Sequence, residues 1–469
     1  MRYVDIPVLE EGLIIFERIK SEGIAHHSYL VGSRGEAAVI DPRRDCQVYI
    51  DLAHQKELKI KHIFETHRNE DYVVGSLELS SITGAQIYHG PGLDWQYGIT
   101  LEDGQRFQIG ALRLVAIHTP GHTDESMSYT IADAATGEAT IMVFTGDTLF
   151  VGEVGRTDLY GPEEAPRLAS NLYDSLFHKL MPLGDGVIIC PAHGGGSVCG
   201  MHIASRDEST IGIERLQNPL LQKSKDEFIK YKVAEKPERP PYFTQMEKYN
   251  LEGPPRFGYR PLPPPLTPPE FRAEIDKGAV VVDTSEPTAF GGAHIPGAYS
   301  IWLRGLPAFA GWILAYNQPI LLVLESQAHL ETAMLYLARI GYDRITGYLK
   351  GGMESWYDAG FPLESLSLLS VHQLKSRLDR GEELVLLDVR GQEEWESGYI
   401  DGARHIYVGH LEQRLARVPR DKPVAVYCTT GHRAGLGASI LARAGYPMVY
   451  NVLGSITAWR AAGYPVTQG

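Results

Sequence analysis

The sequence predicts an α/β protein built from three folded parts: an N-terminal α/β/β/α sandwich and two smaller, related α/β domains with parallel sheets. Three observations support this. In the first half, four short strands each run into a loop that carries His or Asp. A segment with eleven prolines follows, from Pro237 to Pro269. After that segment, one set of motifs occurs twice. At 469 residues, the chain is also longer than a single hydrophobic core usually supports.

Composition restricts the classes of function. The 43% hydrophobic and 22% charged content is typical of globular domains. The formal net charge of −14 argues against a nucleic-acid partner, because phosphates are bound by clustered Lys and Arg. The segment Met1–Phe16 lacks the basic start and apolar run of a signal peptide, and no apolar run is long enough to span a bilayer. We therefore expect no membrane contact and a cytoplasmic location.

The cysteines are few and scattered. They are Cys46, Cys190, Cys199 and Cys428, so free thiols are expected rather than a disulfide framework. Cys190 and Cys199 flank His193 without the spacing of metal ligands. We interpret both as buried structural thiols.

In the first half, residues that suit metal binding come directly after predicted strands. Strands at 60–64, 111–117, 141–144 and 186–190 are followed respectively by His67, His122, Asp147 and His193. Loops at strand ends are held in fixed positions by a rigid sheet. The four side chains are therefore predicted to converge on one edge of the sandwich.

The loop around His67 and the later motifs resemble the metallo-β-lactamase fold, in which a T-H-x-H-x-D-H loop supplies ligands to two adjacent metals. Here the first His and the Asp of that pattern are His67 and Asp71, whereas Asn69 and Tyr72 replace the other two His residues. The resemblance covers residues 1–236. A single metal is therefore expected from this loop.

Within that superfamily the motifs are similar to those of persulfide dioxygenases, which hold one iron through the first loop His, the P-G-H-T His and the T-G-D Asp. The resemblance implies Fe(II), one per chain, on His67, His122 and Asp147, with zinc as the alternative. Two imidazoles and one carboxylate on one face leave positions open for O₂ and a sulfur substrate. For Asp71 and His193 two roles stay open: partners that orient the ligands, or ligands of a second metal. Tyr72 favours the first role.

The run Gly155-Arg156-Thr157-Asp158-Leu159 also resembles the dioxygenase branch. It makes Arg156 a candidate anchor for an anionic thiol carrier such as glutathione or coenzyme A. A structural salt bridge from Arg156 to Asp158 is the alternative.

The proline-rich segment 237–265 is predicted to be an extended, semi-rigid linker. It also contains aromatic residues, among them Tyr242, Phe243 and Tyr249. We therefore expect it to pack against a neighbouring domain rather than to move freely.

After this segment the chain repeats itself. Val281–Ser285 and His294–Ala298 match Leu386–Arg390 and Tyr399–Ala403, and both copies end in a Trp followed by A-G-[FY]-P. These signatures resemble rhodanese sulfurtransferase domains. The resemblance implies two α/β units with parallel sheets, at 266–364 and 365–469.

The two copies differ in the loop that carries the chemistry. In the second copy a strand at 424–427 runs into the six-residue loop from Cys428 to Arg433, the length associated with sulfurtransferases rather than phosphatases. Backbone N–H groups and a helix N-terminus stabilise a thiolate there, so Cys428 is the predicted nucleophile, with a buried inert thiol as the alternative. The first copy has Glu325 and Leu330 at the Cys and Arg positions. It is expected to be inactive and to act as a spacer or docking domain.

The combined resemblance implies a persulfide dioxygenase and rhodanese fusion, acting in sulfide detoxification or sulfur metabolism. It would oxidise a low-molecular-weight thiol persulfide to sulfite with O₂ and pass sulfane sulfur through Cys428. The expected partners are the persulfide of glutathione, coenzyme A or a similar carrier, O₂, and sulfite or thiosulfate. Assembly into a homo-oligomer is compatible with this interpretation.

Two rival interpretations stay open. One is a zinc-dependent thioester hydrolase of the glyoxalase II type fused to rhodanese, which would lack the ligands replaced by Asn69 and Tyr72. The other is a metal-free platform domain carrying an active rhodanese, in which the remaining His and Asp residues only satisfy hydrogen bonds. The metal content distinguishes the three interpretations.

Overall fold

A computed structural model describes residues 14–134, 137–200, 202–258 and 262–468. It divides into two compact units, Met1–Arg260 and Pro261–Gly469. Most of the segment Met1–Phe16 lies outside the described residues. Among the helices that are described, none is long and apolar enough to cross a membrane.

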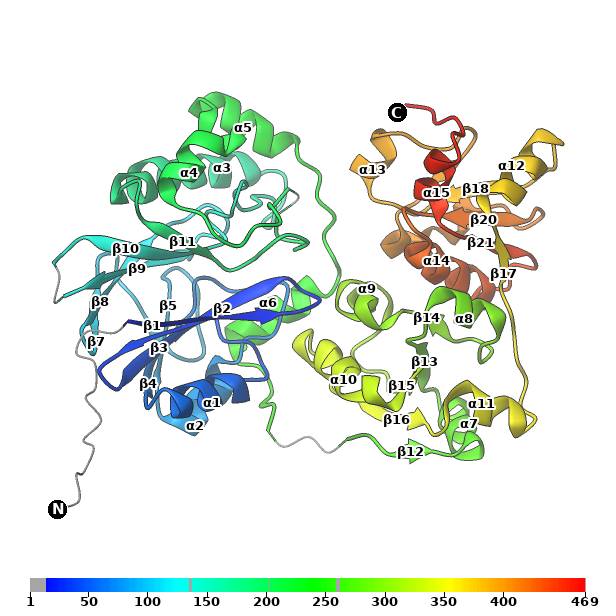
Figure 1. Cartoon of the computed structure of the whole chain (residues 1–469), viewed down its shortest axis with the longest axis horizontal. Coiled ribbons are helices and arrows are strands. Elements are labelled where there is room, and N and C mark those ends of the chain that lie inside the picture. Colours follow the sequence, from blue (N-terminus) through cyan, green and yellow to red (C-terminus); the bar gives the residue numbers. More distant parts are fainter. Residues whose placement is uncertain (1–13, 135–136, 201, 259–261, 469) are drawn as a thin grey trace, which may run out of the picture. The chain divides into compact units, whose positions relative to one another are not determined.

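The first unit contains two sheets and six α-helices in its described part (Figure 1). The first sheet has the order β1-β2-β3-β4-β5-β6 and the second β11-β10-β9-β8-β7. The elements are β1 Ile15–Ser21, β2 His26–Ser33, β3 Glu36–Ile40, α1 Gln47–Gln55, β4 Lys59–Phe64, α2 Ser76–Thr83, β5 Gln86–His89, β6 Ile99–Thr100, β7 Arg106–Ile109, β8 Leu112–His118, β9 Met127–Asp133, β10 Thr140–Gly146, α3 Ala165–Asp174, β11 Ile188–Pro191, α4 Ile211–Gln217, α5 Lys225–Ala234 and α6 Phe243–Glu252.

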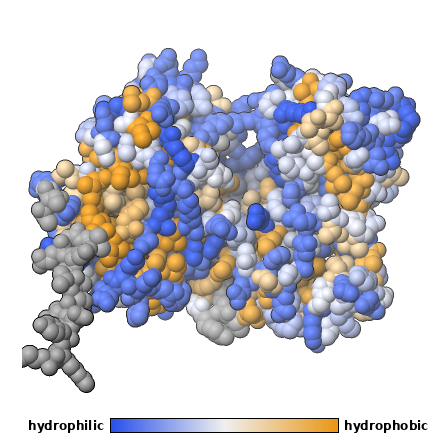
Figure 2. Space-filling view, viewed as in Figure 1, coloured by the Kyte–Doolittle hydropathy of each residue, from blue (hydrophilic) through white to orange (hydrophobic). Residues whose placement is uncertain are grey.

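The two sheets stack face to face, and helices cover both outer faces. Successive residues of a strand point to opposite faces, and β3 shows the result: Ala38 and Ile40 join the core between the sheets, whereas Ala37 and Val39 join the core beneath α1 and α2. A third core lies between the second sheet and α3, α4 and α5. Figure 1 shows these layers, and they confirm the predicted α/β/β/α sandwich. Figure 2 shows hydrophobic residues reaching the surface on the side where β7 to β10 lie.

The proline-rich segment is not a simple linker, because it contains α6 and most of it belongs to the first unit. The side chain of Asn250, on α6, is fully buried. Its amide donates to the carbonyls of Asn69 and Tyr72, each at 2.7 Å, and its oxygen accepts from the N–H of Val74 at 3.0 Å. Helix α6 therefore holds the backbone of the loop that carries His67.

The second unit contains two five-stranded parallel sheets, ordered β12-β16-β15-β13-β14 and β17-β21-β20-β18-β19. The identical arrangement confirms the internal repeat. The elements are β12 Pro265–Leu266, α7 Pro268–Asp276, β13 Val280–Asp283, α8 Pro287–Gly292, β14 Tyr299–Ser300, α9 Leu306–Ile313, β15 Ile320–Val323, α10 Leu330–Arg339, β16 Ile345–Leu349, α11 Gly352–Asp358, β17 Ser367–Leu369, α12 Val371–Asp379, β18 Val385–Asp388, α13 Gln392–Glu396, β19 Arg404–His405, β20 Val424–Tyr427, α14 His432–Arg443, β21 Val449–Val452 and α15 Ser455–Ala461.

The two copies pack against each other through α14, the helix that follows the Cys428 loop. The Ser300 N–H donates to Ser439 Oγ at 3.1 Å, and the Arg443 guanidinium lies over the Tyr299 ring at 3.8 Å. His432, at the start of α14, pairs with Glu286 of the first copy at 3.0 Å. The first copy therefore supports the element on which the predicted nucleophilic loop rests.

Candidate metal centre and sulfur-transfer site

Four strand ends deliver the predicted metal-site residues to one place. His67 follows β4, His122 follows β8, Asp147 follows β10 and His193 follows β11. All four side chains are buried. Gly146, just before Asp147, has a φ of 52°, and a Cβ there would lie 2.6 Å from Cβ of Thr66, so only glycine allows β10 to approach the His67 loop.

Hydrogen bonds orient both imidazoles. The Thr66 hydroxyl donates to Asp41 Oδ2 at 2.8 Å, which leaves its oxygen to accept from Nδ1–H of His67 at 2.9 Å. Nδ1–H of His122 donates to the Arg156 carbonyl at 2.9 Å. Each ring therefore uses its Nδ1–H in a hydrogen bond and directs Nε2 into the site, as in metal-binding histidines.

The atoms that face one another in this site lack hydrogen-bond partners among the described residues, although all are buried. They are Nε2 of His67, Nε2 of His122, Oδ2 of Asp147 and Oε2 of Glu70. Asp147 Oδ2 lies 3.8 Å from His67 Nε2 and 3.6 Å from His122 Nε2. Buried polar atoms nearly always have a hydrogen-bond partner, so four unpaired nitrogen and oxygen atoms that converge are suited to bind a cation.

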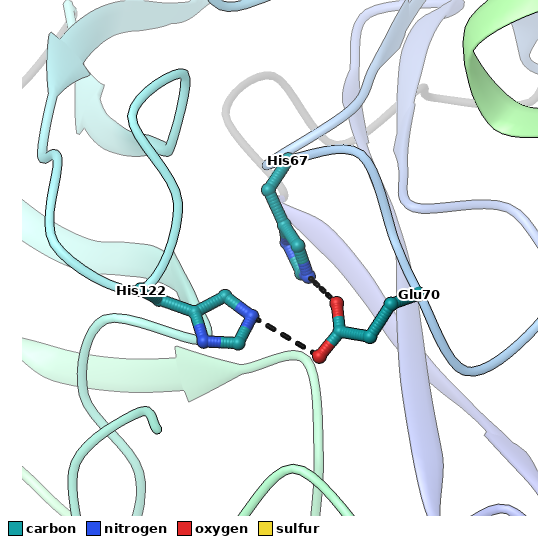
Figure 3. A group of neighbouring side chains, drawn as sticks. All are labelled: His67, Glu70 and His122. Atoms are coloured by element: carbon teal, nitrogen blue, oxygen red, sulfur yellow. Dashed lines mark ion pairs between the residues drawn. The ribbon is translucent and has the colours of Figure 1, made fainter. Parts of the chain in front are cut away.

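Glu70 reaches the same point, which the sequence analysis did not predict. Figure 3 shows His67 and His122 directed at its carboxylate, with Oε2 3.6 Å from His67 Nε2 and Oε1 3.4 Å from His122 Nε2. Cys199 Sγ–H donates to Oε1 at 3.5 Å. Cys199 is buried as expected, and its sulfur lies beside the carboxylates of the site.

His193 lies between two carboxylates. Its Nδ1 is 2.8 Å from Asp147 Oδ1 and its Nε2 is 2.9 Å from Asp71 Oδ2. Asp71, His193 and Cys199 also lie within 4.8 Å of one another. Because both ring nitrogens of His193 already contact carboxylates, the arrangement favours the orienting role over a second metal. Tyr72, at the altered ligand position, instead packs its ring 4.0 Å from the His26 ring.

Negative charge dominates the site. Burial alone would lower the pKa of His67, but Asp147 and Glu70 raise it to about 9. Burial likewise opposes a charge on His193, yet Asp147 and Asp71 raise its pKa well above the ordinary value. Buried carboxylates in such number require a compensating cation.

The residues present fit a divalent metal ion. Two atoms bound to one ion at about 2.1 Å are about 3.0 Å apart at a right angle and about 3.4 Å apart at the tetrahedral angle. The separations of 3.4 to 3.8 Å between the histidine nitrogens and carboxylate oxygens need only a small contraction. Imidazole and carboxylate ligands suit iron as well as zinc.

Arg156 is almost completely buried, and its guanidinium is occupied. It forms two hydrogen bonds to Asp158, at 2.8 and 2.7 Å, and donates to the carbonyls of Val198 and Glu238. Its cation also lies 5.7 Å from the Phe243 ring of α6. The side chain thus forms the structural salt bridge that was the alternative to a carrier anchor.

The sulfur-transfer loop surrounds Cys428 at the end of β20. The Gly431 N–H donates to Cys428 Sγ at 3.1 Å, and the Ser455 hydroxyl lies 3.9 Å from the same sulfur. Gly431 has a φ of 117°, a conformation open to glycine, and immediately precedes α14. The loop therefore directs one backbone N–H and one hydroxyl toward the sulfur.

Arg433 closes the loop without touching the sulfur. It forms a two-point ion pair with Glu394 at 2.6 and 2.7 Å and donates to Thr429 Oγ1 at 2.7 Å. Burial alone would raise the pKa of Glu394, but Arg433 and Thr429 hold it at about 2. In the first copy, Leu330 at the corresponding position is buried and Glu325 is exposed. A nucleophile and its supporting arginine are thus both missing there.

Comparison with known proteins agrees with the site. The metallo-beta-lactamase superfamily model matches residues 22–193, and the rhodanese-like domain model matches residues 267–359 and 370–462. The crystal structure of a metallo-beta-lactamase from Staphylococcus aureus subsp. aureus COL has a TM-score of 0.64 and 29% identity, covering 72% of this chain and 99% of that chain.

Two curated relatives match the first unit. Persulfide dioxygenase ETHE1, mitochondrial, from Bos taurus is 32% identical over 216 residues, covering 44% of this chain and 74% of that protein. Its counterpart from Homo sapiens is 31% identical over 211 residues, covering 43% and 74%. Fold and site thus define a metallo-β-lactamase-fold protein joined to a tandem of rhodanese-like domains. Within that class, the chain belongs to the persulfide dioxygenase family.

Proposed function

We propose that this chain oxidises a low-molecular-weight persulfide to sulfite in its first unit and transfers sulfane sulfur through Cys428 in its second. The first reaction is R–S–SH + O₂ + H₂O → R–SH + SO₃²⁻ + 2 H⁺. The observation that carries it is the convergence of the unsatisfied nitrogens of His67 and His122 on Asp147. We assign these three residues as the ligands of one Fe(II), which would activate O₂ beside the persulfide.

The other residues of the site would maintain this arrangement. Thr66 and the Arg156 carbonyl keep the two imidazole lone pairs directed inward, and His193 holds one oxygen of Asp147 so that the other faces the metal. The burial of the ligands excludes competing water. A two-zinc hydrolase is less well supported, since Asn69 and Tyr72 replace two ligands and His193 is already paired.

The proposed sulfur transfer in the second unit would use the product of the oxidation in the first unit. Cys428–S–S⁻ + SO₃²⁻ → Cys428–S⁻ + S₂O₃²⁻ consumes the sulfite that the metal centre would release. The N–H of Gly431 stabilises the anionic sulfur on either side of this exchange. Arg433 would hold the loop closed through Glu394 rather than bind the acceptor.

The carrier thiol would enter through a cavity of about 500 Å³ that borders His26 and the turn Gly194–Gly196. This volume suits a small ligand. Its lining includes Lys20 but also Glu22 and Asp207. Because Lys20 is paired with Asp207, the lining offers little free positive charge for the phosphates of coenzyme A, and the less highly charged glutathione would suit it better.

Oxygen uptake with matched substrates tests this proposal. Iron-loaded protein should consume O₂ and release sulfite with glutathione persulfide, and do so more slowly with coenzyme A persulfide. Hydrolysis of a glutathione thioester without O₂ uptake would support the glyoxalase II type instead.

A further inference from the structure

Glu70 is a buried carboxylate in the metal site with no assigned role. It stands three residues after His67, at a variable position of the loop pattern, and its side chain is 1% exposed. Leaving an anion at this depth without a cation is costly, so its presence calls for a positive charge close by.

No lysine or arginine forms an ion pair with Glu70 within the described part of the chain; the Arg156 guanidinium, which is bound to Asp158, acts on it only at longer range. Its carboxylate faces His67 Nε2 and His122 Nε2 and accepts from the Cys199 thiol. Its Oε2 has no hydrogen-bond partner within the described part of the chain. The two nitrogens that it faces are the same two that face Asp147.

The distances place all four groups around one point. Oε1 and Oε2 of Glu70 lie 3.4 and 3.6 Å from the two nitrogens, as close as Asp147 Oδ2 at 3.6 and 3.8 Å. Glu70, Asp147 and Cys199 also present donor atoms within 4.8 Å of one another. By these distances, Glu70 is as well placed to bind a metal as Asp147.

We propose that Glu70 is a fourth protein ligand of the metal, so that the centre has two imidazoles and two carboxylates. This inference rests on the proposed metal site. A second carboxylate would neutralise a divalent ion, and it would leave two positions of a six-coordinate ion open instead of three. The persulfide and O₂ would then fill the site, and a hydrolytic water would have no position of its own. This would favour oxygenation over hydrolysis.

The first test is the structure of the full-length protein loaded anaerobically with Fe(II). We expect a Glu70 oxygen within about 2.2 Å of the iron, the usual carboxylate bond length. Iron on His67, His122 and Asp147 with water in place of Glu70 would overturn this inference alone. Iron bound elsewhere, or no iron, would overturn the proposed metal site as well.

The second test measures Fe(II) affinity in Glu70→Gln, which keeps the shape of the side chain and removes its charge. We expect the affinity to fall by at least about 100-fold, beyond the usual effect of losing a partner that only orients a ligand. Glu125→Gln is the matched control: Glu125 is buried and accepts from the Arg68 N–H and the Tyr160 hydroxyl. Equal affinity in wild type and Glu70→Gln would overturn the inference.

Discussion

Nδ1 of His193 lies 2.8 Å from Oδ1 of Asp147, and Oδ2 of Asp147 is left facing the nitrogens of His67 and His122. One oxygen of the aspartate is thus held by the protein while the other is directed at the site. In this geometry Asp147 would serve one metal rather than bridge two. The replacement of two histidines by Asn69 and Tyr72 is consistent with a single ion.

We predict that His122→Ala and Asp147→Ala each lose bound iron and persulfide-dependent O₂ uptake, because each removes an atom that faces the metal position. Asn69→Ala is the matched control in the same site. Among the described residues the Asn69 side-chain amide donates to the His67 carbonyl alone, at 3.2 Å, so a variant without this side chain should retain most of the iron. Elemental analysis of anaerobically purified variants checks this. If Asn69→Ala loses iron as fully as His122→Ala, the ligand assignment is wrong.

Cys428→Ser should abolish sulfur transfer from thiosulfate while the iron content stays unchanged. A hydroxyl is a far weaker nucleophile than a thiolate at neutral pH, and the mutated loop lies in the other compact unit. Transfer assays and metal analysis on the same preparation measure both effects. Sulfur transfer that persists would assign the nucleophile to another thiol, with Cys199 the first to examine.

Glu325→Cys in a Cys428→Ser background should remain inactive. The new thiol would lie on an exposed segment, and a buried Leu330 stands where the active copy has Arg433. A cysteine alone therefore lacks the closed loop that stabilises a persulfide anion. Thiosulfate turnover and the rate of alkylation at neutral pH are the measurements. Substantial turnover would contradict the spacer role of the first copy.

Glu394 gives the second unit a pH-dependent stability. Its pKa is held at about 2 in the folded state, below the ordinary value of 4.5. A lowered carboxylate pKa stabilises the fold above pH 4.5, and this contribution is lost as the pH falls from 4.5 toward 2. Glu394→Gln should therefore be less stable than wild type at neutral pH, with the difference shrinking over that range.

Urea unfolding followed by tryptophan fluorescence measures this difference, because five of the six tryptophans, all except Trp95, lie in the second unit. The carboxylate is partly exposed, so solvent screening keeps the expected effect to about 1 kcal/mol. A difference that grows on acidification would show that Glu394 does not carry the effect.

Local patterns in the sequence were sufficient to predict the strands that lead to His67, His122, Asp147 and His193. Strand periodicity and short motifs can be recognised from a few neighbouring residues. The sequence did not predict that Glu70 and Cys199 lie in the site, and the reason is physical. The two residues are in contact although 129 positions separate them in the sequence, and the path of the loop after His67 directs the Glu70 side chain inward. The helix Phe243–Glu252 was missed because prolines suggested an extended chain, yet they flank a proline-free stretch on both sides.

The most direct test of the account is the stoichiometry of the iron-loaded, full-length protein with glutathione persulfide. We predict about one iron per chain, and one O₂ consumed and one sulfite formed for each persulfide, counted in Cys428→Ser so that sulfite is not converted to thiosulfate. Two zinc ions per chain with thioester hydrolysis, or a metal-free protein that consumes no O₂, would contradict it.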